Sequence, residues 1–386
     1  MSALKNRWVS NGLAMFSMFF GAGNVIFPLM VGYTVKGGVG FALLGLIITA
    51  VIVPFSGLIA TTLFEGNYLS FFNRLGKVPG AFVTILVLAL IGPFGGIPRC
   101  ITLTYSTLSV YFTSLHLVWF TVIATGVIFL FCFKRNRILD LLGLVLTPVL
   151  IVFLLVIVIK GFISGDWNQP DVMDRYDSFI YGLQEGYFTM DLLAAFFFSS
   201  IICERLKEDR VDKVTHKSLI RHLLKASSVG ALLLGLSYIG FATVASLYSD
   251  SLASVPSDHL LGAIGHVVLG PYAGFVVCIA VALSCLTTAI ALTLVSSEFL
   301  QNSIFRGKLP YIWNLVVVLV LTALVSMLEF SGIVKLLAPI LNVAYPSFLL
   351  LSVLNILYKL FKFKPVKTPV LILFVVTFIK VVFFTT

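Results

Sequence analysis

Long apolar runs separated by short polar connections dominate this chain. A membrane-spanning helix needs about 20 mainly apolar residues, and runs of about that length occupy residues 9–35, 39–64, 80–113, 116–133, 138–160, 183–203, 222–248, 271–300, 310–329, 332–358 and 368–386. No hydrophilic stretch long enough for a soluble domain interrupts them. The pattern predicts an all-α polytopic membrane protein with about eleven transmembrane helices in one bundle.

The tenth run contains Tyr345 and Pro346, where it could be divided. Division would give twelve spans and would move four lysines to the extracellular side, namely Lys359, Lys362, Lys364 and Lys367. Because basic residues favour the cytoplasmic side of a membrane, we expect one proline-interrupted helix, eleven spans and an extracellular C-terminus.

Composition and charge agree with a membrane protein. Hydrophobic residues make up 59% of the chain and charged residues 11%, whereas soluble domains have about 25% charged residues. The net charge of +10 does not indicate nucleic-acid binding, because the basic residues lie in short connections between apolar runs. A cytoplasmic N-terminus places most of them inside: Arg74, Lys77, the cluster at 134–137, the basic residues between 205 and 225, Arg306 and Lys308. The acidic connection 166–177 is then extracellular.

The first apolar run is interrupted at residues 20–28 by the sequence FGAGNVIFP. Glycines at two of three successive positions allow the helix to open there and leave backbone groups without helical partners. In a bilayer such groups are tolerated only where protein, water or a ligand completes their hydrogen bonds. The interruption therefore predicts a binding site, and the alternative is an ordinary helix with small residues for close packing.

The sixth run contains a second interruption, EGYFTMD at residues 185–191. Asp191 lies within the apolar stretch, where an ionisable side chain points to a functional site; the alternative is a neutral Asp191 bonded to a neighbouring helix. Interrupted spans at corresponding positions of two halves indicate an inverted-repeat transporter. We expect a first repeat at 1–165, a second at 166–362 and an additional C-terminal span at 363–386.

Four segments resemble those of a known family: GAGNVIFP at 21–28, IGP with IPR at 91–99, GYFTMD at 186–191 and CLTTAI at 285–290. In this order and spacing they are similar to the bacterial branched-chain amino acid:cation symporters, of the amino acid-polyamine-cation superfamily. The resemblance implies a five-plus-five inverted repeat with broken helices 1 and 6, in the bacterial cytoplasmic membrane. It implies sodium-driven uptake of leucine, isoleucine and valine. The family usually has twelve spans, whereas eleven are predicted here.

The opened segments supply candidate substrate ligands. N–H groups at Gly21, Ala22 and Gly23 can bind a carboxylate, because the N-terminus of the following half-helix carries positive partial charge. Carbonyl groups of Tyr187 and Phe188 can accept hydrogen bonds from an ammonium group, which Asp191 can neutralise; Asp191 can instead ligate a cation. Three residues are expected to line the aliphatic side chain, namely Phe188, Ile101 and Tyr105.

Sodium prefers oxygen ligands, and the eighth span offers Ser284, Thr287 and Thr288 on one helix face. By resemblance to related transporters, these hydroxyl groups and the carbonyls of Ser17 and Phe20 hold sodium between spans one and eight. The alternative for the threonines is a hydrogen bond to their own preceding turn. A second cation site at Asn24 and Thr189 is more weakly supported.

Arg99 is expected to pair with Asp191, Glu65 or helix-end carbonyls, as a structural or gating ion pair and not as a substrate ligand. The five cysteines lack C-x-x-C spacing, so neither a metal site nor a disulfide framework is predicted.

The predicted function is sodium-coupled uptake of branched-chain amino acids by alternating access. Proton coupling and another small neutral amino acid remain alternatives. A channel is a weaker one, because the chain has no filter-like repeat. No enzyme activity, organic cofactor or nucleic-acid partner is predicted; the partners are the solute, the coupling ion and the lipid bilayer. No feature of the sequence predicts an oligomeric state.

Overall fold

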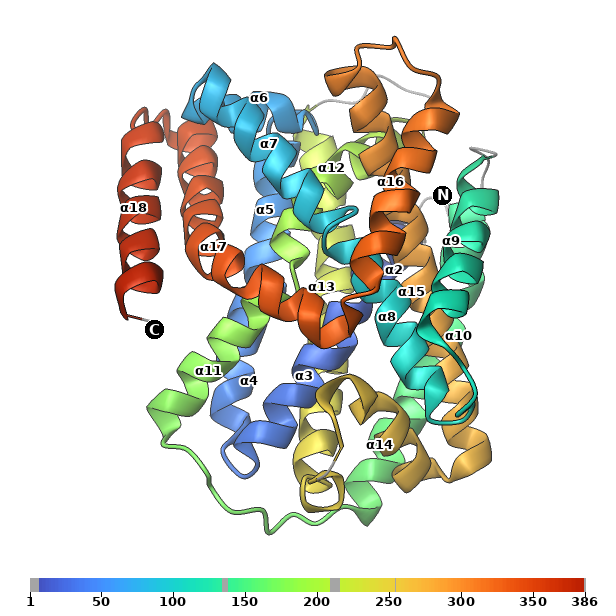
Figure 1. Cartoon of the computed structure of the whole chain (residues 1–386). Helices are drawn as coiled ribbons and strands as arrows, with labels where there is room; N and C mark the ends of the chain where they lie inside the picture. The colour runs from blue at the N-terminus through green and yellow to red at the C-terminus, as the bar shows by residue number, and fades with distance from the viewer. Residues whose placement is uncertain (1–6, 134–137, 209–215, 254, 385–386) are drawn as a thin grey trace.

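The computed structural model describes residues 7–133, 138–208, 216–253 and 255–384, which form helices and connections without a β-strand (Figure 1). The predicted basic cluster at 134–137 and part of the basic connection, residues 209–215, lie outside this described set. The all-α prediction is confirmed.

Each of the eleven predicted spans corresponds to one helix or to two or three consecutive helical segments. The first half contains α2 (Arg7–Phe19), α3 (Ala22–Val35), α4 (Val39–Ile47), the π-helix η1 (Ile48–Ile52), α5 (Val53–Thr62), α6 (Tyr68–Phe72), η2 (Asn73–Leu75), α7 (Lys77–Ile91), α8 (Gly96–Ser109), α9 (Leu117–Phe133) and α10 (Ile138–Ser164). The second half contains α11 (Arg175–Phe188), α12 (Asp191–Glu208), α13 (His216–Leu247), η3 (Asp250–Leu252), η4 (Ser257–His259), α14 (Leu260–Leu269), α15 (Pro271–Phe299), η5 (Leu300–Ile304), α16 (Tyr311–Ser326), α17 (Glu329–Phe361) and α18 (Lys367–Phe384).

Five segments are long and apolar enough to cross a membrane without a sharp bend: Val39–Thr62, Lys77–Ser109, Arg221–Leu247, Pro271–Ile304 and Glu329–Phe361. Two further spans are broken, with a bend of 73° between α2 and α3 and of 43° between α11 and α12. Both breaks fall where the sequence predicts them. The tenth span is the single helix α17, which contains Pro339 and Pro346, so the expected proline-interrupted helix is confirmed.

Helix contacts repeat between the two halves. Broken span one, α2 and α3, packs against α13 of span seven, and broken span six, α11 and α12, packs against α4 and α5 of span two. Span five, α10, packs against α15 of span eight, as span ten, α17, packs against α8 of span three. Exchanging each span for the one five positions later reproduces these contacts, as the five-plus-five inverted repeat requires. The last helix, α18, packs on α17 at the edge of the bundle (Figure 1).

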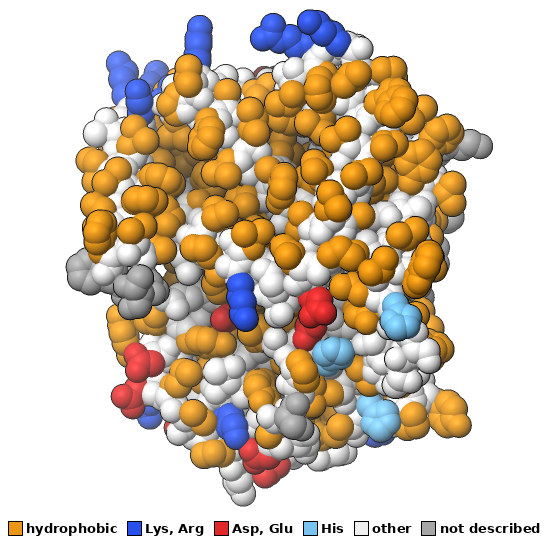
Figure 2. Space-filling view, viewed as in Figure 1, with side chains coloured by type: hydrophobic (Ala, Val, Ile, Leu, Met, Phe, Trp, Pro, Cys, Tyr) orange, Lys and Arg blue, Asp and Glu red, His pale blue; other side chains and the backbone are white. Residues whose placement is uncertain are grey.

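The exterior has the charge distribution of a membrane protein. Figure 2 shows hydrophobic side chains over a broad band, with lysine and arginine side chains gathered beyond it at the end where Figure 1 places α6 and the connection between α17 and α18. Acidic side chains on this face lie toward the opposite end. An apolar band between polar ends fits a protein that crosses a bilayer.

Glycines bring α4 and α11 unusually close together. A Cβ added to Gly182 would collide with the backbone carbonyl of Ala42, and one added to Gly45 would collide with the carbonyl of Phe179. Close backbone approach at small residues is a major source of helix association in membranes. This contact fixes α11, the first half of broken span six, against α4 of span two.

We expect Gly182→Ala to lower the thermal unfolding temperature of the purified protein in detergent, because the methyl group overpacks a rigid backbone contact at a cost of about 1–3 kcal/mol. Gly235→Ala in α13 is the matched control, since a Cβ there meets nothing within 4 Å. Equal unfolding temperatures for Gly182→Ala and the control would contradict the close packing.

Candidate functional site

The break in span one is organised by the side chain of Asn24. The Gly21 N–H donates a hydrogen bond to Asn24 Oδ1 (3.0 Å), while the Phe20 N–H still donates to the Phe16 carbonyl (2.8 Å). In a continuous helix the Gly21 N–H would donate to the Ser17 carbonyl. Here Asn24 Oδ1 takes the place of that carbonyl as the acceptor. The break leaves carbonyl groups at the end of α2 and N–H groups at the start of α3 without helical partners.

The break in span six contains a residue in left-handed backbone conformation. Met190 has φ +63°, which costs about 1 kcal/mol or more for a residue with a side chain. The Thr189 hydroxyl donates to the Gly186 carbonyl (2.9 Å) and the Met190 N–H to the Tyr187 carbonyl (3.2 Å). The turn ends α11 and places Asp191 at the first position of α12.

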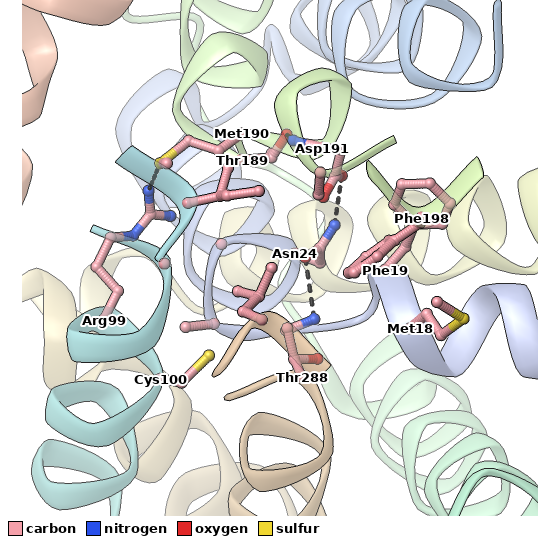
Figure 3. Close-up of a pocket in the computed structure, with 17 residues that line it drawn as sticks. Met18, Phe19, Asn24, Arg99, Cys100, Thr189, Met190, Asp191, Phe198 and Thr288 are labelled. Atoms are coloured by element: carbon pink, nitrogen blue, oxygen red, sulfur yellow. Dashed lines mark hydrogen bonds between the residues drawn. The ribbon is translucent and has the colours of Figure 1, made fainter. Parts of the chain in front are cut away.

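A buried hydrogen-bond network joins the two breaks (Figure 3). Asn24 Nδ2 donates to Asp191 Oδ2 (2.5 Å) and lies 2.5 Å from the Tyr238 hydroxyl, which itself donates to Asp191 Oδ2 (2.9 Å). All three side chains are at most 3% exposed. Tyr238 was missed by the sequence analysis; its only signal was a polar group within the apolar run of span seven.

A cavity lies between the two breaks, α8 and α15. It is lined by seven of the residues predicted as ligands, namely Gly21, Ala22, Gly23, Asn24, Thr189, Asp191 and Thr288. Its lining also includes residues that were not predicted, among them Met18, Phe19, Cys100, Met190 and Phe198 (Figure 3). Its volume is about 40 Å³. This is too small for an amino acid, which could enter only if the surrounding half-helices or side chains moved apart.

Span three is also interrupted at this cavity. Residues 92–95 form a turn between α7 and α8, and both Ile91 and Gly96 line the cavity. The apolar run at 80–113 predicts one span and no interruption. The missed signal was the sequence GPFGG at residues 92–96, since proline and clustered glycines mark turns.

Two predicted substrate residues, Tyr187 and Phe188, lie next to the cavity and do not line it with their side chains. The Tyr187 ring stacks on Tyr345 with ring centroids 4.6 Å apart. The Phe188 ring packs against Phe27 at 5.7 Å. Their backbone carbonyl groups are at the C-terminal end of α11, where an ammonium group is favoured.

The other two, Ile101 and Tyr105, lie away from the cavity between the breaks. Ile101 lines a separate apolar cavity between α8, α9 and α15. Tyr105 packs against Phe120 and donates a hydrogen bond to the Leu115 carbonyl (3.2 Å). They lie two and six residues beyond Arg99 in the sequence, but this spacing could not give the direction in which their side chains point.

The predicted cation ligands divide into two groups. Ser284 and Thr288 both donate hydrogen bonds to the Phe20 carbonyl, at 2.6 and 3.3 Å. The Ser17 carbonyl lies one turn earlier on α2, without the donor that Gly21 would supply to a continuous helix. Thr287 instead donates to the Ser284 carbonyl of its own helix (2.7 Å), as the alternative interpretation of a threonine in a span requires.

The contacts of the Arg99 side chain differ from the ion pair predicted from the sequence. Its side chain is buried, with Nη1 2.9 Å from the sulfur of Met190 and its guanidinium 4.9 Å from the centre of the Phe27 ring. No ion pair between Arg99 and an acidic residue is found in the described part of the chain, and Glu65 is exposed. The expected ion pair is therefore not formed there.

Comparison with known proteins identifies the family. The sequence matches the model of a family described as "Branched-chain amino acid transport protein" over residues 5–385. It is 28% identical to a "Putative branched-chain amino acid carrier protein" of Staphylococcus aureus strain USA300, over 98% of this chain and 88% of that protein. A protein of the same description from Staphylococcus epidermidis is 29% identical, over 89% of this chain and 80% of that protein.

Two solved structures share the fold. Mhp1, a nucleobase-cation-symport-1 family transporter, aligns in its closed conformation with a TM-score of 0.67 and 16% identity, over 92% of this chain and 78% of that chain. MhsT in complex with L-phenylalanine aligns with a TM-score of 0.54 and 16% identity, over 97% of this chain and 98% of that chain. The chain has the inverted-repeat fold of secondary transporters, and it belongs to the branched-chain amino acid transport protein family, whose members are membrane transporters and not enzymes.

Proposed function

We propose that this protein is a sodium-coupled symporter that takes up leucine, isoleucine and valine by alternating access. The observation that carries the proposal is the cavity between two opened helices in a chain of this family. Discontinuous helices near the bilayer midplane are where secondary transporters of this architecture bind solute and ion.

The proposed substrate seat uses both breaks. The substrate carboxylate binds at the N–H groups of Ala22 and Gly23, at the positive end of α3, beside the Gly21 N–H, which belongs less well to this seat because it already donates to Asn24 Oδ1. Its ammonium group lies toward Asp191 and the carbonyl end of α11, at Tyr187 and Phe188. Both charges of the amino acid then have partners, which an otherwise buried zwitterion requires.

The proposed sodium site consists of Ser284, Thr288 and the carbonyl groups of Phe20 and Ser17. These groups are oxygen donors, which suit a hard cation, and both hydroxyl groups already lie within hydrogen-bond distance of the Phe20 carbonyl. Thr287 belongs less well to this site, because its hydroxyl is bonded within α15. Asn24 and Thr189 remain a weaker proposal for a second cation.

The proposed coupling arises because Phe20 and Gly21 are consecutive residues. Sodium bound at the Phe20 carbonyl stabilises the open backbone whose next N–H groups form the carboxylate seat. By thermodynamic linkage each ligand then increases affinity for the other. Rocking of broken spans one and six with their partner helices against the remaining spans would expose the site to alternate sides.

We also propose that the N-terminus faces the cytoplasm of a bacterial cell, in its cytoplasmic membrane, with repeats at residues 1–165 and 166–362. The gathering of basic side chains at one end of the molecule supports this orientation (Figure 2).

A proton-coupled transporter is the second candidate for the coupling mechanism, because Asp191 is a titratable group at the cavity.

Uptake of radiolabelled leucine into proteoliposomes tests the proposal. A sodium gradient should drive saturable uptake, whereas a pH gradient alone should not. Asp191→Asn should reduce sodium-driven uptake by about tenfold or more, because an amide cannot balance the ammonium charge. Asp177→Asn, an exposed acid at the start of α11, is the matched control. Uptake driven by pH alone would favour proton coupling, and no leucine uptake by folded protein would exclude the branched-chain assignment.

Alanine substitutions in α15 test the sodium ligands separately. Ser284→Ala and Thr288→Ala should each raise the sodium concentration for half-maximal leucine uptake by about tenfold, as expected when a cation loses an oxygen ligand. Thr287→Ala, the neighbouring control, should change it by less than about twofold because its hydroxyl bonds only to its own helix. A larger effect at Thr287 than at Thr288 would contradict the proposed site.

A further inference from the structure

Arg99 is a buried cation without a carboxylate partner in the described part of the chain. Its side chain is 3% exposed, and Nε has no hydrogen-bond partner among the described residues. The contacts of the guanidinium are the Met190 sulfur and the rings of Phe27 and Phe330, whose centres lie 4.9 and 5.7 Å away.

These contacts do not satisfy a guanidinium. Arginine carries five N–H donors and no acceptor, and a thioether sulfur is a weak acceptor. Aromatic faces attract the charge but accept no strong hydrogen bond. A buried charge is normally paired and hydrogen-bonded, so Arg99 has unused capacity for an anion.

The guanidinium points at the opened backbone of span one. Arg99 Nη2 lies 2.7 Å from the position that a Cβ on Gly23 would occupy. Gly23 belongs to the first turn of α3, whose N–H groups lack helical acceptors and carry positive partial charge. Two anion-attracting features from different spans therefore meet at Gly23, and both line the cavity.

The carboxylate of Asp191 lines another side of the same cavity. Figure 3 shows Arg99 extending from α8 on one side and Asp191 at the start of α12 on another, with Asn24 bonded to Asp191. Arg99 and Asp191 line the cavity together without forming an ion pair. This separation of a cation from an anion is complementary to a zwitterion.

We propose that Arg99 binds the substrate carboxylate, together with the N–H groups at the start of α3, and thereby restricts transport to amino acids with a free carboxylate. This inference rests on the proposed function and names a specificity-determining residue for it. A guanidinium binds a carboxylate through two parallel hydrogen bonds. The carboxylate replaces the weak contact between Nη1 and the Met190 sulfur, and Gly23 leaves the room that this approach needs.

The test compares the binding of leucine and leucinamide to the purified full-length protein by isothermal titration calorimetry in sodium. Leucinamide keeps the ammonium group and side chain but has no carboxylate. The variants are Arg99→Gln and Arg99→Lys. Arg74→Gln is the matched control, because Arg74 also lies over an aromatic ring, that of Tyr358 at 3.7 Å, but does not line the cavity.

Wild-type protein and Arg74→Gln should bind leucine about 100-fold more tightly than leucinamide, and Arg99→Gln should reduce this ratio to below about tenfold by weakening leucine alone. Arg99→Lys should bind leucine with intermediate affinity, because it keeps the charge without the two-pronged geometry. A purely structural Arg99 would weaken both ligands equally and leave the ratio unchanged. That result overturns the inference. Equal binding of both ligands by wild-type protein also overturns it, and this comparison does not depend on folding of the Arg99 variants.

Two further binding measurements separate the proposed role of Arg99 from failure of the branched-chain proposal and from binding of an inorganic anion. If wild-type protein binds no branched-chain amino acid but binds alanine, the branched-chain proposal fails, and the ratio of alanine to alaninamide decides the role of Arg99 in the same way. Replacing chloride by gluconate should leave leucine binding unchanged. A chloride requirement that Arg99→Gln abolishes would assign the site to an inorganic anion and overturn the inference.

Discussion

The side chain of Asn24 is the contact on which the opened site depends. Its carbonyl oxygen accepts the Gly21 N–H and its amide nitrogen donates to Asp191, so one residue caps the break in span one and ties it to the break in span six. Without this capping, the opened backbone would leave an unsatisfied group at a cost of several kcal/mol in a bilayer. Tyr238 completes the network from span seven.

This arrangement explains why the broken spans pack as they do. Span one lies against span seven and span six against span two, with close glycine contacts such as that of Gly182 with Ala42. In the proposed mechanism these helices move as units, while span eight supplies Ser284 and Thr288 and span three supplies Arg99 from outside them. The cavity lies between these groups of helices, and their proposed relative movement would open or close it.

Much of this organisation could be predicted from sequence, because apolar run length and clustered glycines report directly on membrane spans and their breaks. The break in span one, the break in span six and the single helix α17 follow from local signals, namely the clustered glycines, Asp191 within an apolar run, and the four lysines at 359–367. Side-chain partners do not, since they depend on how distant spans meet. Tyr238 approaches Asp191 across 47 positions of sequence, and Arg99 turns toward Gly23 and Met190 instead of forming the expected ion pair.

The central claim is that cation and substrate stabilise the same opened backbone. Thermodynamic linkage tests it directly: leucine affinity is measured calorimetrically across sodium concentrations at constant ionic strength, with potassium as replacement, and sodium affinity is measured with and without saturating leucine. We expect sodium to increase the affinity for leucine, and leucine to increase the affinity for sodium, by the same factor, about 5- to 150-fold for a typical coupling. Leucine affinity that is equal in sodium and potassium would contradict it.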